Sequence, residues 1–190
     1  MRLTEIVQAH IQTRLSPGDT AIDATAGNGY DTVAMSQAVG PTGRVYAIDI
    51  QSEAIEATRH RLGDAHAVQN CQFLIGDHAR ELEILVQTLA DKVHLITFNL
   101  GYLPGSDKSI QTNTASTLRA LVAASELIKT NGSILITAYR GHDGGAQEAE
   151  AVKSWVESLS PSQWKSTTKE PKVSGSRIPP ILYDLKKIPT

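Results

Sequence analysis

Two glycines and several short polar residues follow the first apolar run of the chain. The segment reads Asp23-Ala-Thr25-Ala-Gly27-Asn28-Gly29-Tyr-Asp31-Thr32. Gly27 and Gly29 allow a sharp turn and a close approach of the backbone to a ligand. A dinucleotide-binding loop carries a third glycine where Thr32 stands, which disfavours a pyrophosphate. Acids with two glycines favour a cationic, phosphate-free ligand such as S-adenosylmethionine, and a purely structural turn is the alternative.

Acidic residues also follow the next two apolar runs. Asp49 stands 22 positions after Gly27, where a carboxylate could accept hydrogen bonds from both ribose hydroxyls with help from Gln51. No basic residue stands beside it, so a ribose phosphate is not favoured. The third run ends in Gly76-Asp77-His78, where Asp77 or a neighbouring amide could bind an adenine amine. Both acids could equally cap the helices that follow. The combined pattern indicates a nucleoside site.

The segment after the fourth apolar run has the residues for a reaction. It reads Phe98-Asn99-Leu-Gly-Tyr102-Leu-Pro-Gly-Ser-Asp107-Lys108. The amide oxygen of Asn99 could orient a nucleophilic amine, and Tyr102 offers a face on which a base could stack. The alternative is an ordinary turn that contains Pro-Gly.

One histidine follows the fifth apolar run. His142 lies in Tyr139-Arg-Gly-His-Asp143 and could act as a general base near neutral pH, although a loop histidine is more often a surface residue. Four other histidines lack the spacing of metal ligands, and no metal site is predicted. They are His10, His60, His66 and His94.

Alternating strands and helices must position these segments. The periodicity predicts helices over 3–15, 32–39, 52–62, 79–90, 114–129 and 146–159. It predicts strands over 20–24, 45–50, 72–75, 93–98 and 133–138, with shorter extended stretches near 163–169 and 181–186. Five apolar strands separated by helices imply an α/β fold with a parallel sheet in a single domain, 1–190. Ligands in such folds bind beyond the carboxyl ends of the strands, where all the segments above would meet.

Composition limits the function classes. A net charge of −2 excludes a uniformly basic nucleic-acid binder. The charge is uneven, because residues 151–190 carry seven basic and three acidic side chains, and this basic segment is either solubilising surface or a face for a polyanion. The lone Cys71 opens the third strand, forms no internal disulfide and is expected in the core. No apolar run is long enough to span a membrane and the first residues do not resemble a signal peptide, so a cytoplasmic protein is expected.

Five motifs together resemble one family, the tRNA 5-aminomethyl-2-thiouridine methyltransferases (MnmM-like), first labelled rRNA methylases. They are Asp23-Ala-Thr-Ala-Gly-Asn-Gly-Tyr-Asp-Thr32, Tyr46-Ala-Ile-Asp-Ile-Gln51, Phe98-Asn-Leu-Gly-Tyr-Leu-Pro-Gly105, Asp107-Lys108 and Tyr139-x-Gly-His-x-Gly144. Ser106 departs from the family pattern, which has glycine there. The segment Ser174-Gly-Ser-Arg-Ile-Pro-Pro180 lacks an asparagine that often precedes the prolines.

The resemblance implies a class I, Rossmann-like methyltransferase fold, a three-layer sandwich whose seven-stranded sheet has its last strand antiparallel. It implies S-adenosylmethionine held by Asn28, Asp31, Asp49, Gln51 and His78. It also implies methylation of the aminomethyl nitrogen of a wobble uridine, with a tRNA anticodon loop as partner, and a homodimer. The alternatives are another RNA methyltransferase that acts on ribosomal RNA or a nucleobase, an NAD-dependent oxidoreductase, and a non-enzymatic nucleoside-binding module.

The combined hypothesis assigns the residues to two roles. Asn99 and Tyr102 position the amine, and His142 or Asp107 accepts its proton if either reaches it. The cofactor contacts come from the ends of the first three strands; they are Asp23, Thr25, Gly27, Asn28, Gly29, Asp31, Thr32, Asp49, Gln51, Asp77 and His78.

Overall fold

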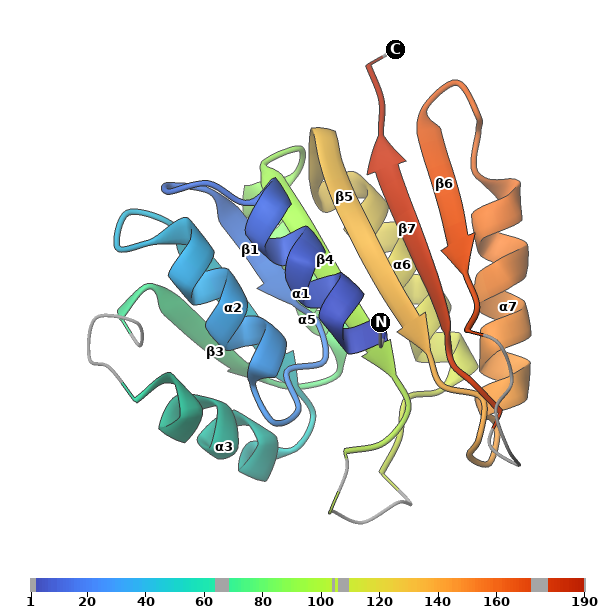
Figure 1. Cartoon of the computed structure of the whole chain (residues 1–190), viewed down its shortest axis with the longest axis horizontal. Coiled ribbons are helices and arrows are strands. Elements are labelled where there is room, and N and C mark those ends of the chain that lie inside the picture. The colour runs from blue at the N-terminus through green and yellow to red at the C-terminus, as the bar shows by residue number, and fades with distance from the viewer. Residues whose placement is uncertain (1–2, 64–68, 104, 106–109, 172–177, 190) are drawn as a thin grey trace.

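The computed structural model describes residues 3–63, 69–103, 105, 110–171 and 178–189. Its centre is a seven-stranded sheet with the order β3-β2-β1-β4-β5-β7-β6 (Figure 1). The strands are β1 (Thr20–Asp23), β2 (Arg44–Asp49), β3 (Cys71–Ile75), β4 (Val93–Leu100), β5 (Ile128–Ala138), β6 (Trp164–Lys169) and β7 (Ile181–Lys187). The pairs among β1 to β5 are parallel, and β7 lies antiparallel between β5 and β6. The expected mostly parallel sheet with an antiparallel last strand is confirmed.

Helices cover both faces of the sheet. On the near face in Figure 1 lie α1 (Leu3–Arg14), α2 (Tyr30–Val39) and α3 (Ser52–Leu62). On the far face lie α5 (His78–Leu89), α6 (Thr114–Leu127) and α7 (Gly145–Ser158). Successive strand residues point to opposite faces, so Leu95 joins the apolar cluster under α1 and α2, while Ile96 joins the one under α5 and α6. Both faces are buried, which explains the nearly continuous apolar strands.

The start of β5 differs from the prediction. We expected a helix through Lys129, but α6 ends at Leu127 and Ile128 already pairs with Val93. The register then shifts, and Asn131 adopts a positive φ of 68°. A Cβ at Gly132 would lie 2.9 to 3.0 Å from backbone oxygens of Lys129, His94 and Val93. Asn131 and Gly132 therefore form a tight irregularity in the strand instead of a helix end.

Two other boundaries matter for the site. Helix α2 begins at Tyr30, two residues before the expected start, and β4 continues to Leu100. Asn99 is therefore part of a strand and not of the loop that follows. Cys71 is buried at the start of β3 as expected, and burial raises the pKa of its thiol to about 11.

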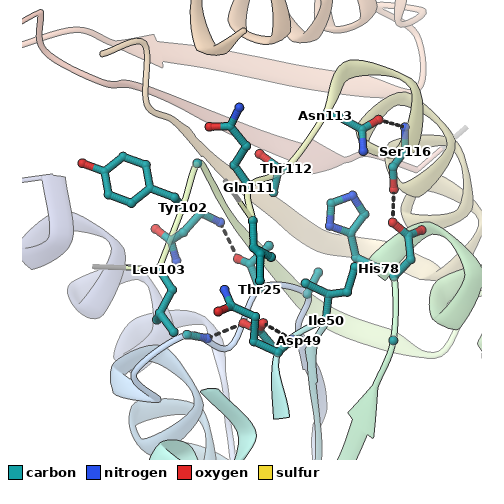
Figure 2. Close-up of a pocket in the computed structure, with 18 residues that line it drawn as sticks. Thr25, Asp49, Ile50, His78, Tyr102, Leu103, Gln111, Thr112, Asn113 and Ser116 are labelled. Carbon is teal, nitrogen blue, oxygen red and sulfur yellow. Dashed lines mark hydrogen bonds between the residues drawn. The ribbon is translucent and has the colours of Figure 1, made fainter. Parts of the chain in front are cut away.

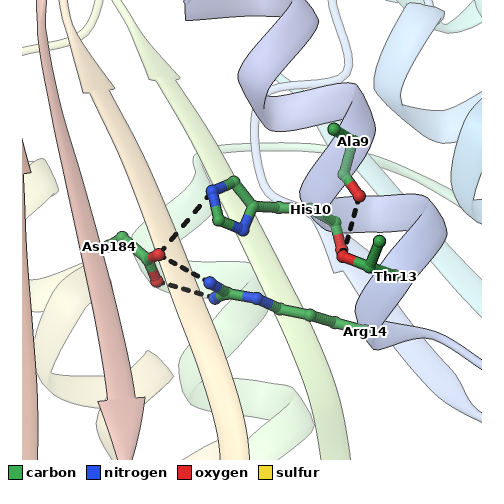
Figure 3. Close-up of polar contacts among 5 residues, drawn as sticks. All are labelled: Ala9, His10, Thr13, Arg14 and Asp184. Atoms are coloured by element: carbon green, nitrogen blue, oxygen red, sulfur yellow. Dashed lines mark hydrogen bonds and ion pairs between the residues drawn. The ribbon is translucent and has the colours of Figure 1, made fainter.

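A paired arginine and aspartate fasten α1 to the C-terminal strand (Figure 3). Arg14 donates two hydrogen bonds to the carboxylate of Asp184 on β7, each of 2.6 Å. His10, one turn earlier, has its Nε2 3.8 Å from the same carboxylate. Ile11, between them in sequence, is fully buried. Helix α1 is thus fixed to the sheet by both apolar burial and a charge pair. No helix in the described part of the chain is long and apolar enough to cross a membrane.

Candidate active site

A pocket lies at the carboxyl edge of the sheet, as the fold rule predicts. It offers about 730 Å³ of space that protein atoms do not fill, part of which is open to the solvent. Its walls come from the ends of β1 to β4 and from the segment that leads into α6 (Figure 2). The lining residues are Ala24, Thr25, Gly27, Asp49, Ile50, Gln51, Gly76, Asp77, His78, Asn99, Gly101, Tyr102, Leu103, Ile110, Gln111, Thr112, Asn113 and Ser116.

The glycine-rich segment forms one wall through Gly27 and Thr25. Gly27 and Gly29 both have positive φ, of 54° and 80°. A Cβ at Gly29 would lie only 2.8 Å from the Cα of Thr58, so this glycine lets the loop pack against α3. The carbonyl of Asn28 accepts a hydrogen bond from Arg61 Nε at 2.6 Å. Gly29 and Asn28 therefore hold the loop in place and do not line the pocket.

Asp23 lies beneath this loop, outside the pocket. It is fully buried, and its carboxylate accepts a 2.6 Å hydrogen bond from the Thr32 hydroxyl. The Thr25 amide, 3.4 Å away, donates a second bond. Burial, with the nearby charge of Asp31, raises the pKa of Asp23 to about 7. The geometry makes Asp23 and Thr32 a support for the loop, whereas the sequence suggested that both would touch a ligand.

Asp49 joins the end of β2 to the glycine loop and lines the pocket. Its two oxygens accept hydrogen bonds from the amides of Gly27 and Gln51, both at 2.9 Å. Gln51, not Asp49, is the N-cap residue of α3, so the capping alternative for Asp49 is wrong. Burial raises the pKa of Asp49, although the two amides oppose this effect. Each carboxylate oxygen can accept further hydrogen bonds, which suits a pair of ribose hydroxyls.

Asp77 and His78 form the wall at the end of β3. Asp77 caps α5, since its Oδ1 accepts from the amides of Ala79 and Arg80, and its Oδ2 accepts from Ser116 Oγ at 2.5 Å. Burial opposes the ionisation of Asp77, but these hydrogen bonds outweigh it and lower its pKa. The capping alternative for Asp77 is thus confirmed, and the residue still lines the pocket.

The ring of His78, the first residue of α5, extends into the pocket (Figure 2). Burial lowers the pKa of His78, so the neutral imidazole is favoured. Its Nε2 is buried and has no hydrogen-bond partner among the described residues. A buried ring nitrogen of this kind is suited to a polar group of a bound ligand, because an unmade hydrogen bond is costly.

Asn99 is held in the pocket by two contacts. Its main-chain amide donates to Thr25 Oγ1 at 2.7 Å, and its Nδ2 donates to Asp31 Oδ2 at 2.9 Å. Asp31 also accepts from Gln8 Nε2 of α1. An ionised carboxylate only accepts hydrogen bonds, so the NH₂ group of Asn99 must face Asp31. This fixes the orientation of the amide, while Asp31 itself stays outside the pocket.

Tyr102 lines the pocket and rests against His142. The two rings meet edge to face, with centroids 5.9 Å apart. His142 is not a lining residue, and its buried Nε2 has no hydrogen-bond partner in the described part of the chain. A Cβ on Gly145 would lie 2.6 Å from that nitrogen. His142 therefore supports Tyr102 from behind. Asp107 lies outside the described residues.

Part of the pocket was not anticipated. Ile50 is 58% exposed directly after Asp49, and the strand pattern had placed it inside β2. The segment 110–113 also reaches the pocket, where Asn113 caps α6 by accepting from the Ser116 amide at 3.0 Å. The only feature of the sequence that pointed to segment 110–113 was the predicted helix start at Thr114. Leu103 of the predicted loop also lines the pocket.

The lining residues set the charge of the pocket. Within the described residues, the walls carry Asp49 and Asp77 but no lysine or arginine. An anionic phosphate is disfavoured here, whereas a ligand with positive charge is favoured. The described residues contain no group of three or more potential metal ligands.

Comparisons with known proteins match the chain to two families. Residues 45–184 match the model of a family described as "Putative rRNA methylase". The chain belongs to this family. Residues 3–83 also match the model of the protein-L-isoaspartate O-methyltransferases, a second methyltransferase family.

Relatives in this rRNA methylase family include curated and solved proteins. The chain is 40% identical, over 171 residues, to the "tRNA (mnm(5)s(2)U34)-methyltransferase, chloroplastic" of Arabidopsis thaliana. The match covers 86% of this chain but only 62% of that protein. A crystal structure of a "putative rRNA-methylase" from Clostridium thermocellum has a TM-score of 0.90 and 33% identity, with 99% and 98% of the two chains covered. A "putative methyltransferase" from Streptococcus mutans, in complex with SAH, has a TM-score of 0.85 and 30% identity, with 99% of both chains covered.

Proposed function

We propose that this protein transfers a methyl group from S-adenosylmethionine to the aminomethyl nitrogen of 5-aminomethyl-2-thiouridine, at the wobble position of a tRNA. The observation that carries the proposal is a pocket with acidic and without basic lining residues, in which Asp49 and Asn99 both lie at the carboxyl edge of the sheet. The name of the Arabidopsis relative supplies the substrate. An anticodon loop is then the RNA element that enters the pocket.

The lining residues fit S-adenosylmethionine. Asp49 offers acceptors for the ribose hydroxyls, and the exposed Ile50 offers an apolar surface for the adenine. The buried, unpaired Nε2 of His78 offers a hydrogen bond at the same end. Gly27 allows the amino-acid part to approach the loop, and the absence of basic lining residues among those described suits the positive sulfonium. This donor set disfavours NAD, whose pyrophosphate would meet two carboxylates.

The chain's own residues must prepare the amine. An alkyl amine is mostly protonated at neutral pH, by analogy with lysine at about 10.4, and only its neutral form can attack. When bound, the cofactor supplies an electrophilic methyl group. Asn99 orients the amine by accepting an N–H bond at Oδ1, and Tyr102 stacks on the base. Burial in the pocket favours the neutral amine, and alignment of the reacting atoms supplies much of the rate.

The proton leaves to water at the pocket mouth in this proposal. His142 stands behind Tyr102 and does not line the pocket, which argues against a role as general base. Asp107 stays a candidate acceptor from the sequence. Loss of activity in Asp107→Asn, with an unchanged affinity for the cofactor, would support Asp107 instead of water.

We also propose that the protein forms a homodimer, as the family resemblance implied, and that it acts in the cytoplasm, as the composition of the sequence indicated. Light scattering of the purified protein gives its mass in solution, with a dimer expected. A monomer at micromolar concentration would contradict this part of the proposal.

Mass spectrometry of tRNA nucleosides from a strain that lacks this gene tests the function. We expect unmethylated 5-aminomethyl-2-thiouridine to accumulate and the methylated form to disappear. An unchanged tRNA profile with a methyl group missing from ribosomal RNA would support the alternative substrate and overturn the proposal.

A further inference from the structure

The positive charge of the C-terminal segment gathers on one face of the β6–β7 hairpin. Trp164, Tyr183 and Leu185 point into the apolar core under α6 and α7. Because side chains alternate along a strand, Lys165 and Lys169 of β6 and Lys186 of β7 point to the opposite face. We call these three lysines the cationic face.

The cationic face is open. No helix stands in front of β6 on the near side of the sheet (Figure 1). All three lysines are exposed, and none forms an ion pair with another described residue. Lys165 and Lys186 are direct register partners, an arrangement that brings like charges close together and costs stability.

The acid on this face is neutralised. Asp184 of β7 lies between the lysines in the pairing, opposite Thr167. Arg14 of α1 holds its carboxylate with two hydrogen bonds of 2.6 Å (Figure 3). Because Arg14 compensates the charge of Asp184, the positive charge of the three lysines is not cancelled by this acid.

One end of the cationic face lies toward the edge of the sheet that carries the pocket. Strands β5 and β6 are both antiparallel to β7, so β6 runs parallel to the strands whose ends form the pocket. Lys169 at the end of β6 thus lies toward the pocket edge, and Lys165 and Lys186 lie toward the opposite edge. Four strand residues span about 13 Å, a length that covers several backbone phosphates of one RNA strand.

We propose that the cationic face binds the phosphate backbone of the substrate RNA, along the stem that continues from the base held in the pocket. This inference rests on the proposed function. A second copy of this chain is a less suitable occupant, because a row of lysines on an edge strand opposes pairing between copies.

The test is a charge-removing triple variant, Lys165→Gln/Lys169→Gln/Lys186→Gln. Its matched control, Arg44→Gln/Lys92→Gln/Lys153→Gln, removes three exposed cations from elsewhere on the surface. Binding of the hypomodified tRNA is measured by fluorescence anisotropy over a series of salt concentrations, with methyl transfer measured beside it. We expect the Kd for tRNA and the KM to rise roughly tenfold in the triple variant, with kcat and the affinity for S-adenosylhomocysteine unchanged. The slope of log Kd against log salt should fall by about two to three.

Equal tRNA affinity and equal salt slope in the triple variant and the control would overturn the inference. A change of oligomeric state confined to the triple variant would also overturn it, since the face would then join two copies. Because binding is read separately from turnover, a wild-type protein that binds tRNA through these lysines without methylating it would refute the proposed function alone.

Discussion

Asn99 at the end of β4 donates a 2.9 Å hydrogen bond from its Nδ2 to Asp31 at the start of α2. The two residues are 68 positions apart, and the pair connects the proposed reaction site to the glycine loop. A carboxylate cannot donate when ionised, so the pair leaves Oδ1 of the amide to accept from a substrate. Burial raises the pKa of Asp31, while its bonds from Asn99 and Gln8 oppose that rise.

Replacement of Asp31 by Ala should release the amide of Asn99, because alanine offers no acceptor to its Nδ2 group. We expect kcat to fall roughly tenfold to a hundredfold, because a small misplacement of the nucleophile is costly, while the Kd for S-adenosylhomocysteine changes little. Asn99→Ala should show the same division between turnover and cofactor affinity. Steady-state kinetics measures kcat, and calorimetry measures the Kd for S-adenosylhomocysteine. Equal losses in both would mean that Asp31 contacts the cofactor directly, as the sequence first suggested.

Asp49→Asn should weaken the cofactor instead. The variant loses a charged acceptor for the ribose, a change worth about 1.5 to 3 kcal/mol per charged hydrogen bond. Calorimetry with S-adenosylhomocysteine should show a Kd about tenfold to a hundredfold higher. Glu53→Gln, which changes an exposed carboxylate on α3, is the control and should bind as the wild type does. An unaltered Kd in Asp49→Asn would remove this residue from the cofactor site.

Gly145→Ala should disturb Tyr102 through His142. The new Cβ would lie 2.6 Å from His142 Nε2, so the ring must move and the edge-to-face contact with Tyr102 is lost. We expect kcat/KM for tRNA to fall roughly tenfold without a change in cofactor affinity. Gly141→Ala is the matched control, since nothing lies within 4 Å of a Cβ there. Identical kinetics of the two variants would show that His142 does not support Tyr102.

Asp23→Asn should flatten the dependence of stability on pH. The folded protein holds the proton of Asp23 up to about pH 7, whereas the unfolded chain releases it near its ordinary pKa of 3.8. The folded state binds more protons in this range, so the free energy of unfolding should decrease as pH rises from about 4 to about 7. Urea unfolding at several pH values measures the slope, which should be smaller in Asp23→Asn and unchanged in the exposed Asp143→Asn. The same slope in wild type and Asp23→Asn would contradict an elevated pKa.

The sequence predicted the sheet and the location of the pocket because both follow from strong local patterns. Strands buried on two faces are nearly all apolar, and the polar segments after them must meet at one edge. The sequence alone therefore places Asp49, Asp77 and Asn99 together. The early start of β5 at Ile128 could not be predicted from the sequence, because the pairing of Ile128 with Val93 depends on contacts between distant segments.

Which polar residues face the pocket was less predictable. Asp23 ends β1 and Asp31 lies in the first turn of α2, on either side of one loop, but the path of that loop buries Asp23 under Thr32 and directs Asp31 to Asn99. Segment 110–113 reaches the pocket because of the route between β4 and α6, and no local pattern reports that route. Contacts such as these depend on tertiary geometry, which residue types and spacing do not determine.

The central claim is methyl transfer to one nitrogen of a tRNA wobble uridine. Purified protein is incubated with hypomodified tRNA and methyl-labelled S-adenosylmethionine, and the digested nucleosides are analysed by mass spectrometry. The account predicts that 5-aminomethyl-2-thiouridine gains a single labelled methyl group on its aminomethyl nitrogen, and that Asn99→Ala does so far more slowly. Label on another nucleoside or on ribosomal RNA, or no label in any RNA, would contradict it.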